Sequence, residues 1–195
     1  MQFFLFFTMF DLRLQSPFSL ILSGPSSSGK TSLLNKLLTV RNDLFTEQPV
    51  KIRLYFSIWQ PVYDVMKKQN LITDYIEGMP TGDELESFQK SVNSSLVIFD
   101  DLAEVLTPVI SNLFIAGCHH YNTSVILISQ NLFQKSPVWR ICSLNATYII
   151  VMKNPRDPSQ LGVLSRQSFP GHKNFLSSVC KYCIFFFYVI QGLFK

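Results

Sequence analysis

The chain has 195 residues, a formal net charge of +4 and four cysteines. Apolar residues make up 47% of it and charged residues 15%, which excludes a disordered chain and favours one α/β domain with a sizeable core. The small positive charge permits contact with nucleic acid but does not indicate it. Because the cysteines form no disulfide framework, we expect an intracellular protein that is not secreted.

The first elements in chain order form a strand, a loop and a helix. Residues 1–10 are apolar but lack a basic segment and a cleavage site, so we interpret residues 1–14 as an N-terminal extension rather than a signal peptide. Residues 18–23 form an apolar run between a proline and a glycine, which predicts a buried strand. Residues 31–40 place their leucines on one helical stripe, which predicts a helix.

The remaining elements continue this alternation. We predict strands at residues 51–59, 96–99, 124–129 and 146–152, and helices at residues 61–69, 83–90, 107–117 and 158–167. Strands that are apolar on both faces and alternate with helices are typical of a mostly parallel sheet covered on both sides. The fold class is therefore α/β, with three layers.

The C-terminal end is again apolar, over about a dozen residues. That is shorter than the roughly 20 residues that span a bilayer, so we expect no membrane association. The run is compatible with a buried strand, a terminal helix, or sequence foreign to the domain. We accordingly divide the chain into the extension, a domain at residues 15–175 and a tail at residues 176–195.

The loop after the first strand carries the most specific motif. Gly24-Pro-Ser-Ser-Ser-Gly-Lys-Thr31 matches G-x-x-x-x-G-K-[ST], in which glycines let backbone N–H groups point at phosphates. Lys30 then reaches the β- and γ-phosphates, and the Thr31 hydroxyl ligates Mg²⁺. This predicts a P-loop NTPase that binds ATP and Mg²⁺. The expected nucleotide-binding residues are Gly24, Pro25, Ser26, Ser27, Ser28, Gly29, Lys30, Thr31 and Ser32.

A pair of acids follows the strand predicted at residues 96–99. Ligands bind at the carboxyl ends of strands in an open α/β sheet, so Asp100 is expected beside the phosphates as a Mg²⁺ ligand. Asp101 is the candidate that polarises the attacking water, and Glu104 is the alternative. Helix capping is the competing explanation for both aspartates.

A polar residue, Gln130, directly follows the strand predicted at residues 124–129. In a parallel sheet it would lie near the γ-phosphate, where it could sense that group or orient the water. Farther upstream, Gln60 could contact the nucleotide or a neighbouring subunit, and the sequence does not decide between them. Tyr55, Phe56, Trp59 and Tyr63 could stack on bases, but aromatic residues on and just beyond a strand are more often core.

Together these segments resemble the FtsK–HerA superfamily, and within it the genome-packaging ATPases of poxviruses and of Maverick/Polinton transposons. The resemblance lies in residues 17–31, 97–101 and 119–167, and covers roughly residues 15–175. It implies a P-loop NTPase fold of the RecA/ASCE-like type, with an extra strand between the phosphate-loop strand and the acidic strand. It also implies a ring of subunits that translocates double-stranded DNA by ATP hydrolysis, working with capsid or portal components.

In such rings an arginine from one subunit reaches the γ-phosphate of its neighbour. The resemblance offers Arg140 as the first candidate, with Arg156 and Arg166 as alternatives. The chain departs from the family beyond Lys173, which leaves a decayed nucleotide-binding remnant as one alternative function. A nucleotide or small-molecule kinase, which would share the phosphate loop, is the other.

Overall fold

A parallel sheet organises the protein, for which we have a computed structural model that describes residues 11, 13–117, 120–168, 171 and 185–189. The described strands form one seven-stranded sheet in the order β3-β2-β4-β5-β1-β6-β7. All neighbours are parallel except β7, which runs antiparallel to β6. The strands are β1 (Ser19–Ser23), β2 (Lys51–Phe56), β3 (Asp74–Glu77), β4 (Ser95–Asp100), β5 (Thr123–Ser129), β6 (Tyr148–Met152) and β7 (Phe185–Val189).

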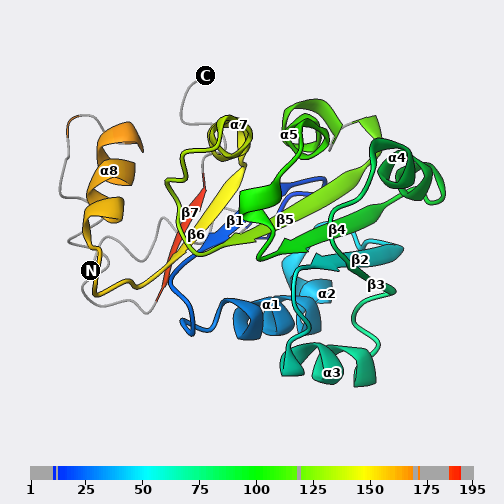
Figure 1. Ribbon diagram of the computed structural model, residues 1–195. Helices are drawn as coiled ribbons and strands as arrows, with labels where there is room; N and C mark the ends of the chain where they lie inside the picture. Colours follow the sequence, from blue (N-terminus) through cyan, green and yellow to red (C-terminus); the bar gives the residue numbers. More distant parts are fainter. Residues whose placement is uncertain (1–10, 12, 118–119, 169–170, 172–184, 190–195) are drawn as a thin grey trace.

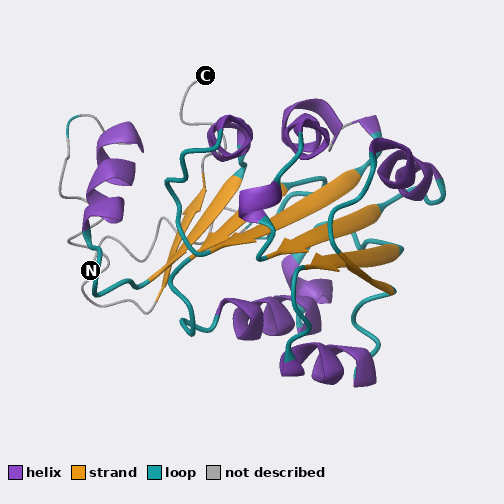
Figure 2. Cartoon of the chain, in the orientation of Figure 1, coloured by secondary structure: helices purple, strands orange, loops and turns teal. Residues whose placement is uncertain are grey.

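Helices cover the two faces of the sheet (Figures 1 and 2). One face carries α1 (Lys30–Thr39), α2 (Arg41–Leu44) and α3 (Pro61–Lys68), and the other carries α4 (Gly82–Lys90), α5 (Pro108–Asn112) and α7 (Pro137–Asn145). The chain also forms a 3₁₀ turn, η2 (Ala103–Val105), a π-helical turn, η3 (Leu113–Gly117), and α8 (Ser159–Ser168). This is the three-layer α/β architecture that the sequence predicts.

The core consists of two apolar clusters, one on each side of the sheet. Successive strand residues point to opposite faces, so Ile21 of β1 joins one cluster, while Leu20 and Leu22 join the other. The central strands β1, β4 and β5 are buried along their whole length. This explains why they are apolar without alternation and why the sequence reveals them clearly.

The order of the strands confirms one feature that the resemblance implies. Strand β5 lies between β1, which precedes the phosphate loop, and β4, which ends in Asp100. The residues that follow all three strands therefore emerge side by side at one edge of the sheet.

Several short elements differ from the prediction. The predicted strand 51–59 ends at Phe56, and the predicted helix 107–117 is α5 followed by a π-helical turn. We missed β3, because this four-residue edge strand begins with Asp74, ends with Glu77 and has no apolar run. We also missed α2, which has only four residues, and α7, whose apolar residues include the exposed Ile141 and Leu144 and so form no clear stripe.

The C-terminal tail contains β7, so its interpretation as a strand holds for Phe185–Val189. Residues 176–184 and 190–195, like the apolar run at residues 1–10, lie outside the described residues. The domain boundaries therefore stay predictions. Across the part of the chain that the structure describes, no helix has the length and apolarity needed to cross a bilayer.

Candidate nucleotide-binding site

The loop between β1 and α1 has the backbone of a phosphate-binding loop. Ser27 and Gly29 adopt left-handed conformations, with φ of 61° and 89°. Gly24 is required for a different reason, since a Cβ at this position would lie 2.5 Å from Cβ of Met152 on β6. Among the described residues no side chain caps the N-terminus of α1, so its first-turn N–H groups are available to anionic oxygens.

Lys30, the first residue of α1, bends back over this loop. Its Nζ donates to the carbonyl oxygens of Gly24, at 2.7 Å, and Pro25, at 2.9 Å. Burial lowers the pKa of the Lys30 ammonium, and the nearby carboxylates of Asp100 and Asp101 oppose that shift. The ammonium is therefore held at the mouth of the loop and faces the two acids.

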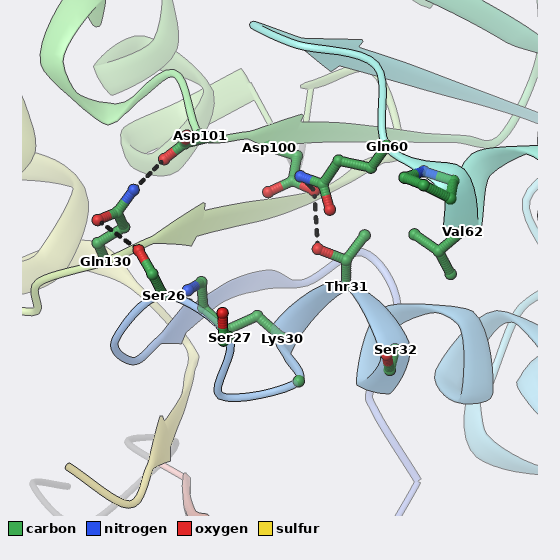
Figure 3. A pocket seen from close by; sticks show the side chains of 12 residues that line it. Ser26, Ser27, Lys30, Thr31, Ser32, Gln60, Val62, Asp100, Asp101 and Gln130 are labelled. Carbon is green, nitrogen blue, oxygen red and sulfur yellow. Dashed lines mark hydrogen bonds between the residues drawn. The ribbon is translucent and has the colours of Figure 1, made fainter.

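Asp100 is the last residue of β4 and is only 2% exposed. Its Oδ2 accepts a hydrogen bond of 3.2 Å from the Thr31 hydroxyl of α1 (Figure 3). Burial raises the pKa of this carboxyl, while hydrogen bonds from Tyr63 and Thr31 lower it. A hydroxyl beside a carboxylate is an oxygen donor set that suits Mg²⁺.

Asp101, Gln130 and Ser26 join three separate segments by side-chain hydrogen bonds (Figure 3). The Gln130 Nε2 donates to Oδ1 of Asp101 at 3.0 Å, and the Ser26 hydroxyl donates to Oε1 of Gln130 at 3.1 Å. Asp101 itself adopts a left-handed conformation with φ of 57°. The acid after β4 and the amide after β5 are thus held against the phosphate loop.

These side chains line one open cavity of about 430 Å³. Gln60, Pro61 and Val62, which lie at the start of α3, complete its wall. The sequence left the role of Gln60 undecided and gave no signal for Pro61 or Val62. The full lining is Ser26, Ser27, Gly29, Lys30, Thr31, Ser32, Gln60, Pro61, Val62, Asp100, Asp101 and Gln130.

Other predicted residues lie elsewhere. Gly24 and Pro25 meet Lys30 through their carbonyl oxygens and do not line the cavity, and neither does Ser28. Glu104 is exposed in η2, and it is absent from the lining as well.

The three candidate arginines are also absent from the cavity lining. Arg140 is exposed on α7, where it lines a separate groove of about 790 Å³. Arg156 is exposed in the segment before α8, and Arg166 is exposed near the end of that helix. None of them lines that cavity in its own chain, so their role stays a prediction.

The fold and the site define a P-loop ATPase. The family model described as Poxvirus A32 protein matches residues 7–179. The match covers most of the chain, which therefore belongs to the poxvirus A32 protein family. No curated protein matches the chain.

The chain is similar to two solved structures, of which the first supports the fold. The cytoplasmic domain of the Type VII secretion ATPase EccC from Thermomonospora curvata is 13% identical, with a TM-score of 0.53 over 76% of this chain and 21% of that chain. EssC (ATPases 2 and 3) from Geobacillus thermodenitrificans is 12% identical, with a TM-score of 0.48 over 69% of this chain and 32% of that chain. The protein thus spans only 21% of the EccC chain, and the likeness concerns the fold alone.

Proposed function

We propose that this protein is an ATP-hydrolysing motor that translocates double-stranded viral or transposon DNA into capsids. One observation carries the proposal: Lys30, Asp100 and the Asp101–Gln130 pair line a single cavity at the carboxyl edge of the sheet. Family membership supports a packaging role, and the resemblance to the FtsK–HerA superfamily supports translocation. We place the protein inside the cell, at the site of virus assembly.

ATP binding is assigned to the loop and the first turn of α1. Its N–H groups and the helix dipole bind phosphate oxygens, and Lys30 supplies positive charge for the β- and γ-phosphates. The Lys30 ammonium already lies over the loop, bonded to two carbonyl oxygens. Phosphate binding would exchange these contacts for ones in which the acceptor is charged as well as the donor.

Thr31 and Asp100 are the residues that would hold Mg²⁺, in agreement with their oxygen atoms and their mutual hydrogen bond. When bound, Mg²⁺ neutralises charge on the β- and γ-phosphates. Asp101 accepts a proton from the attacking water, and Gln130 orients that water. Asp101 is favoured over Glu104 as the base for two reasons. Asp101 is hydrogen-bonded to Gln130, and it lines the cavity, whereas Glu104 does not.

An arginine is expected to stabilise the negative charge that develops on the γ-phosphate during hydrolysis. The described part of the cavity lining contains no arginine. We assign this role to Arg140 of a neighbouring subunit, with Arg156 and Arg166 as alternatives. The assignment requires a ring in which α7 of one subunit faces the cavity of the next. Double-stranded DNA would run through that ring toward a capsid or portal.

The test is ATP hydrolysis by the purified chain with and without long double-stranded DNA, beside a Lys30→Ala control. Hydrolysis that DNA stimulates and that the control lacks is the expected result. If the folded wild-type chain hydrolyses no ATP in either condition, the proposal is wrong and a decayed remnant becomes the better description.

A further inference from the structure

We propose that Tyr63, assisted by Gln60, is a positioning residue that orients the Asp100 carboxylate toward the divalent cation of the nucleotide complex. The inference rests on the proposed function, since it concerns the cation that accompanies ATP. Both residues follow β2, the strand that pairs with β4 on the side opposite to β5.

The hydrogen bonds around Asp100 are one-sided. Its Oδ2 accepts from the Tyr63 hydroxyl at 2.7 Å and from Gln60 Nε2 at 3.4 Å, in addition to the bond from Thr31. Within the described residues, no hydrogen bond reaches Oδ1. The bond from Tyr63 is the shortest of the three and lies in a buried environment, where a charge-assisted bond is strong. One oxygen is therefore fixed by the protein, and the other is left for a ligand.

Local structure explains why Tyr63 reaches this carboxylate. Phe56, the last residue of β2, lies in register with Asp100 on the neighbouring strand. The chain then turns, and Pro61 begins α3 at a position where its missing N–H costs nothing. Tyr63 lies in the first turn of this helix, and its N–H donates to the Gln60 carbonyl at 2.9 Å. The helix start thus lies directly beside the end of β4.

Packing fixes the Tyr63 ring as well. Its centroid lies 5.6 Å from that of Phe56, 5.4 Å from that of Trp59 and 6.3 Å from that of Tyr75. The ring is fully buried, so the hydroxyl has little freedom to move away from Asp100. A ring held in this way can keep the carboxylate in one orientation, as a positioning residue must.

A comparison with Tyr75 shows that a tyrosine can pack in this aromatic cluster without a hydrogen bond to its hydroxyl. Its hydroxyl is buried, and in the described part of the chain it has no hydrogen-bond partner. Tyr63 and Tyr75 therefore occupy the same aromatic cluster, and only the Tyr63 hydroxyl meets the site. Tyr75→Phe is the matched control for Tyr63→Phe, because each variant removes one buried oxygen atom.

The experiment measures binding of a fluorescent ATP analogue to the full chain as Mg²⁺ is titrated, and again in EDTA. We expect Tyr63→Phe to raise the Mg²⁺ concentration at half-maximal binding about tenfold, the effect of one hydrogen bond to a charged group. Binding in EDTA should equal that of the wild type. Tyr75→Phe should leave both quantities unchanged, and both variants should melt cooperatively.

Gln60→Ala provides a second variant at a partly exposed position, where the fold is less at risk. Its longer bond predicts a smaller rise, of about two- to threefold. If Tyr63→Phe and Gln60→Ala both respond to Mg²⁺ like the wild type, or if Tyr63→Phe binds Mg²⁺ more tightly, the assignment is wrong. A wild-type chain that binds no nucleotide with Mg²⁺ would instead overturn the proposed function, and this assignment with it.

Discussion

The nucleotide cavity and the surface around α7 use polar residues in opposite ways. In the cavity, Asp101 and Gln130 are hydrogen-bonded to each other and through Ser26 to the phosphate loop. On α7, Arg140 is exposed and forms no ion pair with any other described residue. Leu144 of the same helix is 66% exposed. Under the proposed function, residues that act in their own chain's cavity are held by that chain, whereas the arginine that acts on a neighbour remains accessible.

The largest effect is expected for Arg140→Ala, which should lower ATP hydrolysis by the assembled protein about 10³-fold, as for other arginines that act in trans. Affinity for ATP should change little, because the role proposed for the arginine is to stabilise charge in the transition state. Hydrolysis rates and nucleotide binding are measured on the same preparation. Arg156→Ala and Arg166→Ala test the two alternative arginines in the same way.

Mixing subunits of two inactive variants tests the action in trans more directly. Arg140→Ala subunits retain an intact cavity, and Lys30→Ala subunits retain the arginine, so mixtures of the two should recover part of the activity. If Arg140→Ala hydrolyses ATP at the wild-type rate, Arg140 does not act on a neighbouring subunit, and its exposure needs another explanation.

Within the cavity, Asp101→Asn and Gln130→Ala should each lower kcat about 10²-fold, the usual loss of a group that acts in the transition state. Because neither residue belongs to the phosphate loop, KM for ATP should stay close to the wild-type value. Steady-state kinetics measure both quantities. Full activity in Asp101→Asn, together with a large loss in Glu104→Gln, would move the base from Asp101 to Glu104.

A smaller, structural effect is expected for Gly24→Ala. The added methyl group would lie 2.5 Å from Met152 Cβ, so β6 or the phosphate loop must shift. We expect a loss of about 1–3 kcal/mol in the free energy of unfolding, typical of overpacking. Chemical denaturation measures it. Gly82→Ala is the control, since a Cβ there meets Val109 at an ordinary 3.7 Å.

The smallest effect is expected for Thr81→Ala at the start of α4. The Thr81 hydroxyl accepts from the Glu84 N–H, and the Glu84 carboxylate accepts from the Thr81 N–H, which forms a capping box. Its loss should cost about 1 kcal/mol and lower Tm by about 2–4 °C. Hydrolysis should remain within about twofold of the wild type, because α4 does not contribute to the cavity lining. Ser87→Ala on the same helix should leave Tm unchanged.

The sequence was sufficient for the central strands and for most of the cavity. Strands β1, β4 and β5 are buried on both faces, so each appears as an apolar run that ends at a polar residue. Since parallel strands bring their carboxyl ends to one edge, Asp101 and Gln130 could be placed beside the phosphate loop before any contact was known.

The role of Tyr63 could not be predicted in this way. An aromatic residue after a strand is typical of a core, and Tyr63 is indeed buried. Its contact with Asp100 depends on β2 pairing with β4, and on α3 starting immediately after the turn. The short edge strand β3 was missed for a related reason, because half-exposed residues carry little apolar signal.

The most direct test of a DNA motor is displacement of a labelled third strand from a long duplex during ATP hydrolysis by the wild-type chain. We predict that ATP with Mg²⁺ releases the strand, and that Lys30→Ala, or ATP in EDTA, leaves it bound. If the wild-type chain hydrolyses ATP on this DNA while the third strand stays in place, the protein is an ATPase but does not translocate, which would contradict the proposed function.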